Sequence, residues 1–332
     1  MTEYITLAHG SGGRDYRTLV ETIFSPAFQN EYLSPLTDAA ILPAGEQIAL
    51  TTDGFVVSPL FFPGGDIGRL AVCGTVNDLA VSGAIPRYLS CAMILEAGLP
   101  LETLRRVVDS MATAAKEAGV LIVTGDTKVV EAGGVQGLTI TTAGVGVFPA
   151  GCRIPTQQPQ PGDAILCSSE LASHGMAVMA ARHNLGFTPV IESDARPLNH
   201  IIRTVLSANV DVSAMRDPTR GGVAETLTEW AGTSLDITLE ESALPLRADV
   251  KAACAILGID PLYVANEGVV LICVPAEQAT RALNALRENP GCEGAAIIGR
   301  VNEGRGHVFV ETKIGTFRRV LPPSGTLLPR IC

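Results

Sequence analysis

Hydrophobic positions follow two different periods between residues 45 and 148, which predicts a mixed α/β unit. Apolar runs of strand length cover residues 46–57, 87–98, 120–127 and 138–148. Residues 101–119 place apolar side chains three or four positions apart, and residues 66–84 are rich in small and apolar residues; both patterns favour helices. The expected order is therefore strand, helix, strand, helix, strand, strand.

The composition changes at residues 149–163, which separate this unit from a second one. Proline, glutamine and glycine dominate there ("PAGCRIPTQQPQPGD"). The following pattern predicts strands at 164–169, 235–240, 268–275, 295–301 and 307–312, and helices at 174–185, 197–208, 221–232, 249–258 and 276–289. The expected fold class is α+β, with an N-terminal domain over 1–148, a C-terminal domain over 149–320 and a flexible tail over 321–332.

Composition and charge exclude some classes of function. Hydrophobic residues make up 47% of the chain and charged residues 17%, as in a compact globular protein. The net charge of −10 argues against general nucleic-acid binding, because no basic patch offsets the acidic excess. The sequence shows neither a signal-peptide pattern nor an apolar run of membrane-spanning length, so we expect a cytoplasmic protein.

The eight cysteines form no CxxC pair. Several lie inside apolar runs, and we expect seven of them to be buried, reduced thiols. Cys332 is the exception, because it lies on the predicted tail and is expected to be exposed.

Acidic residues recur at the ends of predicted elements and favour a magnesium–triphosphate site. Asp53 closes the strand at 46–57 and is followed by glycine, while Asp126 and Lys128 follow the apolar run at 120–124. Asn77 and Asp78 lie side by side in the helix of small residues. Each carboxylate alone is compatible with a turn or a cap, but burying three of them is costly unless they bind a metal or a partner.

Two glycine-rich segments are candidate phosphate sites. The first, "HGSGGR" at residues 9–14, precedes a helical stretch, and its small residues let backbone N–H groups converge on an anion. It matches no Walker pattern, so a flexible turn is the alternative. The second is "RDPTRGGV", where Arg220 comes just before a glycine pair that opens a helix. A nearby "VANEGVV" places Glu267 in a predicted turn, and Asp217 and Glu267 also have structural interpretations as a cap and a turn residue.

Taken together, "DIGRLAVCGTVNDLAVSGAIPRYLS", "GDTKVV" and "DPTRGGV" resemble the superfamily of aminoimidazole ribonucleotide synthetase and selenophosphate synthetase. Within it, "AHGSGG", "PLFFPGGDIG", "NDLAVSGAIPRYLSC" and "PRIC" resemble the HypE family of hydrogenase-maturation proteins. One position departs from the pattern: an Asp-His-Gly is expected, and this chain has Ser173 before His174.

The resemblance implies a fold and an activity. The N-terminal sheet would pair with that of a second copy in a homodimer, forming a barrel-like core with ATP at the interface, and an α+β domain would pack against it. The activity would be ATP- and Mg²⁺-dependent dehydration of a carbamoylated C-terminal cysteine to a thiocyanate. The carbamoyl group would come from the transferase HypF, and the cyanide would pass to iron on a HypC–HypD scaffold for the [NiFe]-hydrogenase centre.

The resemblance also implies residue roles. The implied catalytic residues are Cys332, Asp78, Lys128 and Glu267, and either Asp78 or Glu267 would be the base. The implied nucleotide-binding residues are His9, Gly10, Ser11, Gly12, Gly13, Asn77, Thr127 and Arg220. The implied magnesium ligands are Asp53, Asp78 and Asp126.

Two other functions compete with this interpretation. A selenophosphate synthetase or small-molecule ligase would need a reactive cysteine near the N-terminal glycines, but the first cysteine is Cys73, inside a predicted helix. A non-catalytic thiol carrier would not need acids such as Asp53 and Asp126. The strand at 138–148 is apolar on both faces, which independently favours a homodimer, because a lone domain would expose it.

Overall fold

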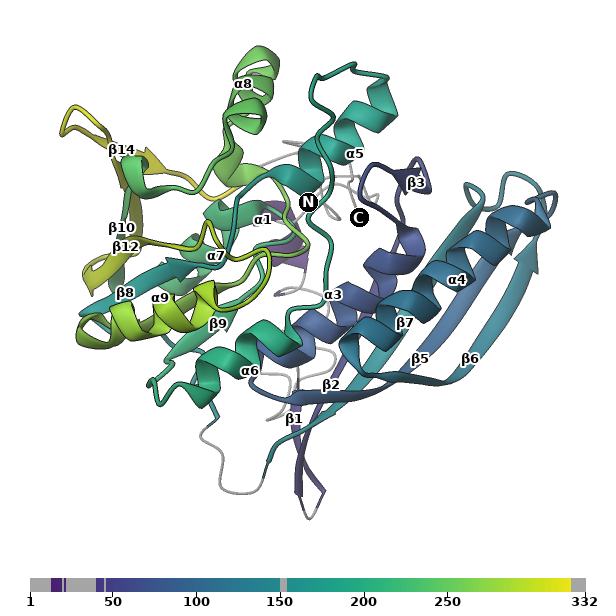
Figure 1. Ribbon diagram of the computed structural model, residues 1–332, viewed down its shortest axis with the longest axis horizontal. Coiled ribbons are helices and arrows are strands. Elements are labelled where there is room, and N and C mark those ends of the chain that lie inside the picture. Colours follow the sequence, from purple (N-terminus) through teal and green to yellow (C-terminus); the bar gives the residue numbers. More distant parts are fainter. Residues whose placement is uncertain (1–12, 20, 22–39, 45, 150–153, 324–332) are drawn as a thin grey trace.

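The described part of the chain forms two large sheets, each covered by helices, with one helix between them, and a small two-stranded sheet (Figure 1). This computed structural model describes residues 13–19, 21, 40–44, 46–149 and 154–323. The first sheet has the strand order β1-β2-β7-β5-β6, and only its β5–β6 pair is parallel. Its strands are β1 Ala40–Ala44, β2 Glu46–Phe55, β5 Ile85–Glu96, β6 Leu121–Val130 and β7 Leu138–Val147.

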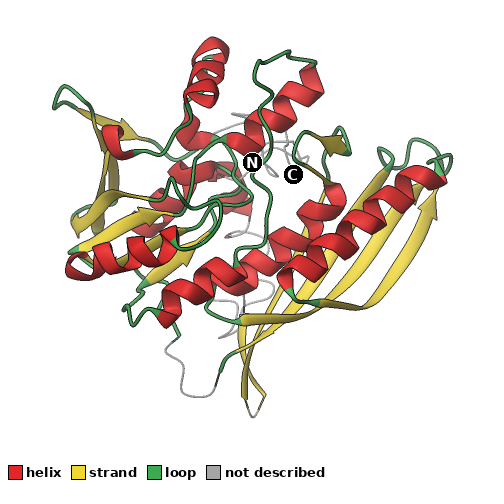
Figure 2. Cartoon of the chain, viewed as in Figure 1, coloured by secondary structure: helices red, strands yellow, loops and turns green. Residues whose placement is uncertain are grey.

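Two helices, α3 Ile67–Val81 and α4 Leu101–Ala118, pack on one side of the first sheet (Figure 2). The small hairpin β3 Phe61–Phe62 and β4 Gly65–Asp66 leads into α3. The Asp66 carboxylate caps α3 by accepting hydrogen bonds from the backbone N–H groups of Gly68 and Arg69. Gly119 ends α4 in the left-handed region that glycine adopts without strain. These local signals determine where α3 begins and where α4 ends.

The second sheet has the order β14-β13-β10-β12-β8-β11-β9, and only its β10–β13 pair is parallel. Its strands are β8 Asp163–Cys167, β9 Ala214–Arg216, β10 Leu235–Glu240, β11 Leu271–Pro275, β12 Ala296–Glu303, β13 His307–Glu311 and β14 Phe317–Val320. The helices of this part are α5 Ser173–His183, α6 Asn199–Ser207, α7 Gly222–Ala231, α8 Ala248–Leu257 and α9 Ala279–Arg287. Short 3₁₀ turns cover η3 Glu241–Ala243, η4 Pro261–Tyr263 and η5 Ala276–Gln278, and α1 Gly13–Leu19 is the first described helix.

The predicted α+β class and the order of long elements are confirmed. The short strands β1, β3, β4, β9 and β14 were not predicted. Two to five residues carry too little periodicity to be recognised, and their partners in the sheet define them. The helix expected from residue 276 begins with the 3₁₀ turn η5. The domain limits stay a prediction, and the tail beyond Pro323 lies outside the described residues.

Two further expectations concern cysteines and membranes. Six cysteines are free and buried, at positions 73, 91, 167, 254, 273 and 292, which confirms the prediction for those six; Cys152 lies outside the described residues. Over the described part of the chain, no helix is both long enough and apolar enough to cross a membrane.

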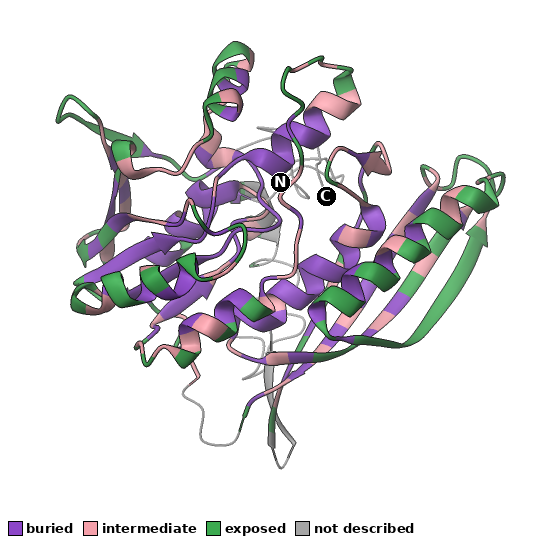
Figure 3. Cartoon of the chain, viewed as in Figure 1, coloured by how far each residue is buried: buried purple, intermediate pink, exposed green. Residues whose placement is uncertain are grey.

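The strand at 138–148 is not an edge. It is β7, in the middle of the first sheet, with alternating buried positions. The exposed edge is β6, which lies at the end of the strand order and is solvent-exposed along nearly its whole length (Figure 3). The physical reason given for a homodimer therefore applies to β6 rather than to β7.

Helix α3 is buried on almost every side, because it packs on the first sheet and also contacts α6 and β9 of the second domain. Its fully buried Asn77 holds the two domains together. The amide nitrogen donates to the backbone oxygens of Arg196 and Glu267, at 3.2 and 3.1 Å, and the amide oxygen accepts from Leu198 N–H at 2.8 Å. The Asn77 amide therefore stabilises the contact between the two domains, because apolar packing alone would leave these backbone groups without hydrogen-bond partners.

We expect Asn77→Ala to lower the free energy of unfolding by roughly 2–4 kcal/mol, because three buried backbone groups lose their partner. Thermal or urea unfolding measures this loss. The exposed Asn302→Ala is the control and should change stability by less than about 0.5 kcal/mol. Equal effects of the two substitutions would contradict the assigned role of Asn77.

Candidate active site

A cavity of about 240 Å³ lies where the end of β2, helix α3 and the start of α7 meet. Its lining is dominated by ionisable side chains: Asp53, Asp78, Asp217, Glu225, Glu229, Glu267, Arg216 and Arg220. Six carboxylates thus face two guanidinium groups. So much negative charge in one cavity is costly to fold, and it indicates a site that works on a cation or on groups accompanied by cations.

Asp53 and Asp78 approach the cavity from different elements. Asp53 lies near the end of β2, where its carboxylate accepts the N–H of Gly54 at 2.7 Å. Asp78 projects from α3 and accepts a hydrogen bond from the hydroxyl of Thr51, at 2.9 Å. Burial raises the pKa of Asp53, and the Gly54 N–H and the charge of Arg220 oppose the shift. The structure therefore brings these two predicted ligands into one cavity.

Glu267 is the most deeply buried acid of this cavity, at 2% exposure. Burial raises its pKa well above the ordinary value, and the negative charges of Asp217, Asp194 and Asp53 raise it further, against the charge of Arg220. A carboxyl group with a raised pKa can exchange protons near neutral pH, as acid–base catalysis requires.

Arg220 and Asp217 come from the turn that precedes α7. This turn needs Gly221 and Gly222, which both have positive φ angles. A Cβ on Gly222 would lie 2.6 Å from the backbone oxygens of Leu262 and Val264, so only glycine fits. The glycines let α7 begin against the cavity, with Arg220 in its lining.

Glu225, in the first turn of α7, also lines the cavity and was not predicted. One carboxylate oxygen pairs with Arg17 of α1 at 2.9 Å, and the other has no hydrogen-bond partner among the described residues. Burial is the main cause that raises its pKa to about 7. A Cβ on Gly221 would lie 2.6 Å from the Glu225 Cβ and 3.3 Å from Pro323, so the last described residue lies beside the cavity wall.

The described end of the chain is held here by two contacts. The Tyr263 hydroxyl bonds to both the carbonyl oxygen and the N–H of Leu321, at 2.9 and 3.2 Å. The backbone oxygen of Pro323 accepts the N–H of Arg14 at 3.1 Å. The start of α1 and the start of the tail are therefore paired at the same place.

The predicted site residues of β6 lie elsewhere in the same subunit. Asp126 and Lys128 pair with each other at 3.3 Å on the exposed edge, and Thr127 lies between them. Strands β7 and β5 separate β6 from β2, which places Asp126 about 14 Å from Asp53 at the usual strand spacing. One subunit does not bring Asp126 to the cavity.

The remaining predicted residues have other placements. Asn77 uses its amide on three backbone groups at the domain seam, so its geometry gives no support to nucleotide binding. His174 is buried, and its Nδ1 bonds to the Ser193 hydroxyl at 2.8 Å, while Ser173 begins α5. Gly13 starts α1; His9, Gly10, Ser11, Gly12 and Cys332 lie outside the described residues.

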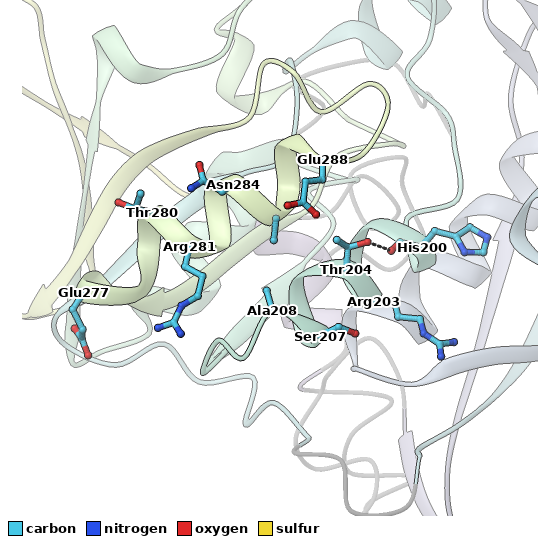
Figure 4. A pocket seen from close by; sticks show the side chains of 11 residues that line it. His200, Arg203, Thr204, Ser207, Ala208, Glu277, Thr280, Arg281, Asn284 and Glu288 are labelled. Atoms are coloured by element: carbon cyan, nitrogen blue, oxygen red, sulfur yellow. Dashed lines mark hydrogen bonds between the residues drawn. The ribbon is translucent and has the colours of Figure 1, made fainter.

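A larger cavity of about 990 Å³ lies between α6 and α9 (Figure 4), and none of these acids lines it. Its lining mixes the charges of Arg203 and Arg281 with those of Glu277 and Glu288 and contains no predicted site residue. It is an open groove without a converging set of catalytic groups.

The carboxylates of the cavity could supply some, but not all, of the ligands that Mg²⁺ needs. No group of three or more His, Cys, Asp or Glu side chains in the described part of the chain is placed to hold a metal. Mg²⁺ is, however, commonly bound by one or two carboxylates together with phosphate oxygens and water. Asp53 and Asp78 satisfy that requirement, and the acidic lining would repel a triphosphate that arrived without cations.

Comparison with known proteins places the chain in a class. Models of AIR synthase related proteins match both parts: the N-terminal domain at residues 36–148 and the C-terminal domain at residues 160–311. The chain therefore belongs to the AIR synthase related proteins. Within this class it is a member of the HypE family of carbamoyl dehydratases.

Full-length relatives support that membership. The carbamoyl dehydratase HypE of Azotobacter vinelandii is 49% identical over 333 residues, covering 99% of this chain and 97% of the relative. The crystal structure of a HypE–HypF complex contains a chain with a TM-score of 0.87 and 48% identity, covering 92% of this chain and 99% of that one. A HypE structure in complex with ATP has a TM-score of 0.82 and 45% identity, covering 99% and 100%.

Sequence reasoning missed Thr51, Arg216 and Glu225 in the cavity. Thr51 and Arg216 carry no local signal, since they act through contacts made by folding. An acid inside the otherwise apolar segment "GGVAETL" was a usable signal for Glu225, because a charge at a core position needs a partner.

The raised pKa of Glu225 predicts a pH dependence of stability. Between pH 4.5 and about 7 the folded chain keeps a proton that the unfolded chain has lost, so stability falls as pH rises through this window. Glu225→Gln should remove that loss and stabilise the protein at pH 8 by about 1–3 kcal/mol, with little change at pH 4. Urea unfolding at both pH values measures it.

The matched control is Glu229→Gln on the same helix, whose side chain is 31% exposed against 8% for Glu225. It should change stability much less at pH 8. A stabilisation of equal size at pH 4 and pH 8 would refute the pH effect assigned to Glu225.

Proposed function

We propose that the chain catalyses the ATP-dependent dehydration of a carbamoyl group on Cys332 to a thiocyanate. The observation that carries this proposal is the single cavity that joins the carboxylates Asp53 and Asp78 with Arg220 and the buried Glu267, beside the point where Pro323 leads to the tail. Family membership supplies the class of reaction, and the cavity has the groups which that reaction needs.

The reaction needs a better leaving group than hydroxide. The oxygen of –S–C(=O)NH₂ attacks the γ-phosphorus of ATP, ADP departs, and the oxygen becomes part of a phosphate ester. Arg220 neutralises negative charge on the transferring phosphoryl group. Asp53 and Asp78 would hold Mg²⁺, which when bound supplies charge neutralisation on the phosphates.

Loss of the phosphate requires removal of protons from nitrogen. Glu267 is suited to accept the proton whose loss forms the C≡N bond, because its raised pKa makes it a stronger base than an ordinary carboxylate. Phosphate then leaves with the oxygen, so the net change is loss of water from the carbamoyl group and hydrolysis of ATP. Asp78 is less suited to this role, because its carboxylate accepts the Thr51 hydroxyl and is assigned with Asp53 to Mg²⁺ in the same cavity.

The position of Pro323 supports access of the cysteine to the cavity. Nine residues follow Pro323 up to Cys332, and an extended chain of that length spans at most about 30 Å. The tail can therefore reach outward to a partner or fold back into the cavity. A HypE relative crystallised with HypF, and we propose HypF as the carbamoyl donor and a HypC–HypD complex as the cyanide acceptor for this chain too.

We propose that the active form is a homodimer through β6. This free edge exposes Leu121, Val123 and Val129 by 64%, 56% and 67%, and a long apolar edge favours pairing with another strand. Pairing with a second copy would carry Asp126, Thr127 and Lys128 toward the other subunit's cavity, where Asp126 and Lys128 would serve the phosphates. Residues 9–13 would close over the same nucleotide.

Intact-mass measurement tests the proposed reaction. Incubated with carbamoyl phosphate, ATP and HypF, the wild-type protein should gain one carbamoyl group and then lose the mass of one water. Cys332→Ala should gain nothing, because its acceptor thiol is gone. Asp53→Asn should be carbamoylated but not dehydrated, because the phosphoryl transfer fails.

Cys152→Ala, which removes another cysteine, is the control and should behave as the wild type. Carbamoylation of Cys332→Ala would refute the acceptor, and dehydration of Asp53→Asn at the wild-type rate would refute the role of that carboxylate.

Mixing inactive variants tests whether Asp126 serves the other subunit. Asp53→Asn and Asp126→Asn, each inactive alone, should recover about a quarter of the wild-type activity once their subunits have exchanged. After random exchange, half of the dimers contain one subunit of each variant. In each of these dimers one of the two sites combines a native Asp53 with a native Asp126, so a quarter of all sites are active.

The control is a mixture of Asp53→Asn with Asp78→Asn. Both acids lie in the same subunit's cavity, so this mixture should recover nothing. Absence of recovery in the first mixture after proven subunit exchange, or a fully active monomer, would contradict the proposed dimer.

A further inference from the structure

The loop between α5 and α6 runs between the two domains, and its residues 193–198 form what we call the inter-domain strap (Figures 1 and 2). Its N-terminal part is tied to the first domain. Ser193 N–H donates to Pro63 O at 2.8 Å, and the Arg69 guanidinium donates to Ala195 O at 2.7 Å. A Cβ on Gly64 would lie 2.6 Å from Ser193 N, so the two segments are in close contact.

The same strap is tied to the second domain. His174 Nδ1 bonds to the Ser193 hydroxyl at 2.8 Å, and the Arg196 guanidinium donates to Gly268 O at 3.0 Å. Arg196 also reaches Pro290 O at 3.2 Å. The strap is therefore fixed from both sides, and His174 supports it structurally.

Asp194 connects the strap to residues 267–268, which carry the proposed base Glu267 and which we call the catalytic turn. Its two carboxylate oxygens accept the backbone N–H groups of Glu267 and Gly268, at 3.2 and 3.3 Å. A Cβ on Gly268 would collide with Asp194 O, so the turn approaches the strap more closely than any other residue would allow. Asn77 donates to Glu267 O at 3.1 Å. The backbone of Glu267 is thus held at its nitrogen by the strap and at its oxygen by α3.

An acid in this half-buried position, with no arginine paired to it directly in a described ion pair, needs a reason. Burial raises the pKa of Asp194 to about 6, against the two backbone N–H groups and the charge of Arg196. An uncharged acceptor would cost less to bury in this place. The carboxylate offers what a neutral side chain does not: two acceptor oxygens for adjacent N–H groups and a negative charge close to Glu267.

We propose that Asp194 is a positioning residue for the dehydration: from the inter-domain strap it fixes the backbone of Glu267 so that the Glu267 carboxyl faces the cavity. The inference rests on the proposed role of Glu267. Because the strap is bound to both domains, a shift of α3 relative to the second domain is transmitted to the catalytic turn. The charge of Asp194 also strengthens Glu267 as a base.

The test compares dehydration of the carbamoylated full-length protein in four variants: Asp194→Asn, Asp163→Asn, Glu267→Gln and the double variant Asp194→Asn/Glu267→Gln. Asp163 is the matched control, since it is buried and accepts Gln160 N–H and the Ser213 hydroxyl away from the cavity. Asp194→Asn should lower kcat about tenfold to a hundredfold with little change in the KM for ATP. Asp163→Asn should lower stability without this fall in kcat.

Two readouts separate positioning from loss of stability. The substitution Asp194→Asn removes a negative charge beside Glu267, while the charges of Asp53, Asp217 and Arg220 stay in place. The pKa of Glu267 should therefore fall, and the acid limb of the profile of kcat against pH should move to lower pH. The double variant should be no slower than Glu267→Gln alone, because Asp194 acts through Glu267.

The experiment distinguishes a failure of the proposed role of Glu267 from a failure of the inference about Asp194. Wild-type dehydration by Glu267→Gln would refute the proposed role of Glu267 itself. An inactive Glu267→Gln together with a kcat of Asp194→Asn equal to that of Asp163→Asn would overturn the inference about Asp194, as would additive effects in the double variant. If Asp194→Asn does not fold, Arg196→Lys probes the same turn: it keeps the charge and loses the contact to Gly268 O, and a wild-type kcat would then overturn the inference.

Discussion

The burial of negative charge at the domain junction is the constraint on which this structure depends. Glu267 has almost no contact with water and Asp194 is half-buried, while Glu225 lies nearby with one carboxylate oxygen that has no hydrogen-bond partner among the described residues. Each would be destabilising if the surrounding backbone and arginines did not compensate for it. Much of the local architecture serves this purpose: Gly221 and Gly268 let the backbone approach Glu225 and Asp194 closely, and Arg17 and Arg196 supply positive charge.

This arrangement explains why the domains are joined by polar contacts as well as by apolar packing. Two domains joined only by apolar contacts can shift relative to each other, because dispersion contacts have little directional preference. The Asn77 amide instead satisfies three specific backbone groups, so only one relative position of α3 and the Glu267 turn keeps all three bonds. The proposed roles, a catalytic carboxyl at Glu267 on one domain and metal-binding carboxylates at Asp53 and Asp78 on the other, need such a fixed seam, since displacement of about 1 Å has a large effect on rate.

The sequence predicted the long elements and the acids that lie at their ends. Asp53 and Glu267 were recognisable because a carboxylate beside a glycine at a strand end or turn is a local pattern. Asp194 was not recognised, because its importance comes from a contact with Gly268, 74 residues away. For Glu225 the acid in an apolar segment was a local signal, but its partner Arg17 in the N-terminal helix could not be read from it. The grouping of Asp126 with Asp53 failed within one subunit for a related reason: strand order is set by pairing, and no local pattern reveals that β7 and β5 lie between them.

The segment that leads to the tail and the inter-domain strap both lie beside the cavity, but they are held with different strengths. The segment from Leu321 to Pro323 is held by one hydrogen bond from Arg14 and two with Tyr263, each worth about 1 kcal/mol, so it can be released and re-formed at small cost. The strap is held by several partly buried hydrogen bonds to both domains, and releasing it would leave the Glu267 N–H without its Asp194 acceptor. The proposed mechanism requires this difference, because a substrate that is part of the chain has to enter and leave the cavity while the turn that carries the proposed base Glu267 stays in place.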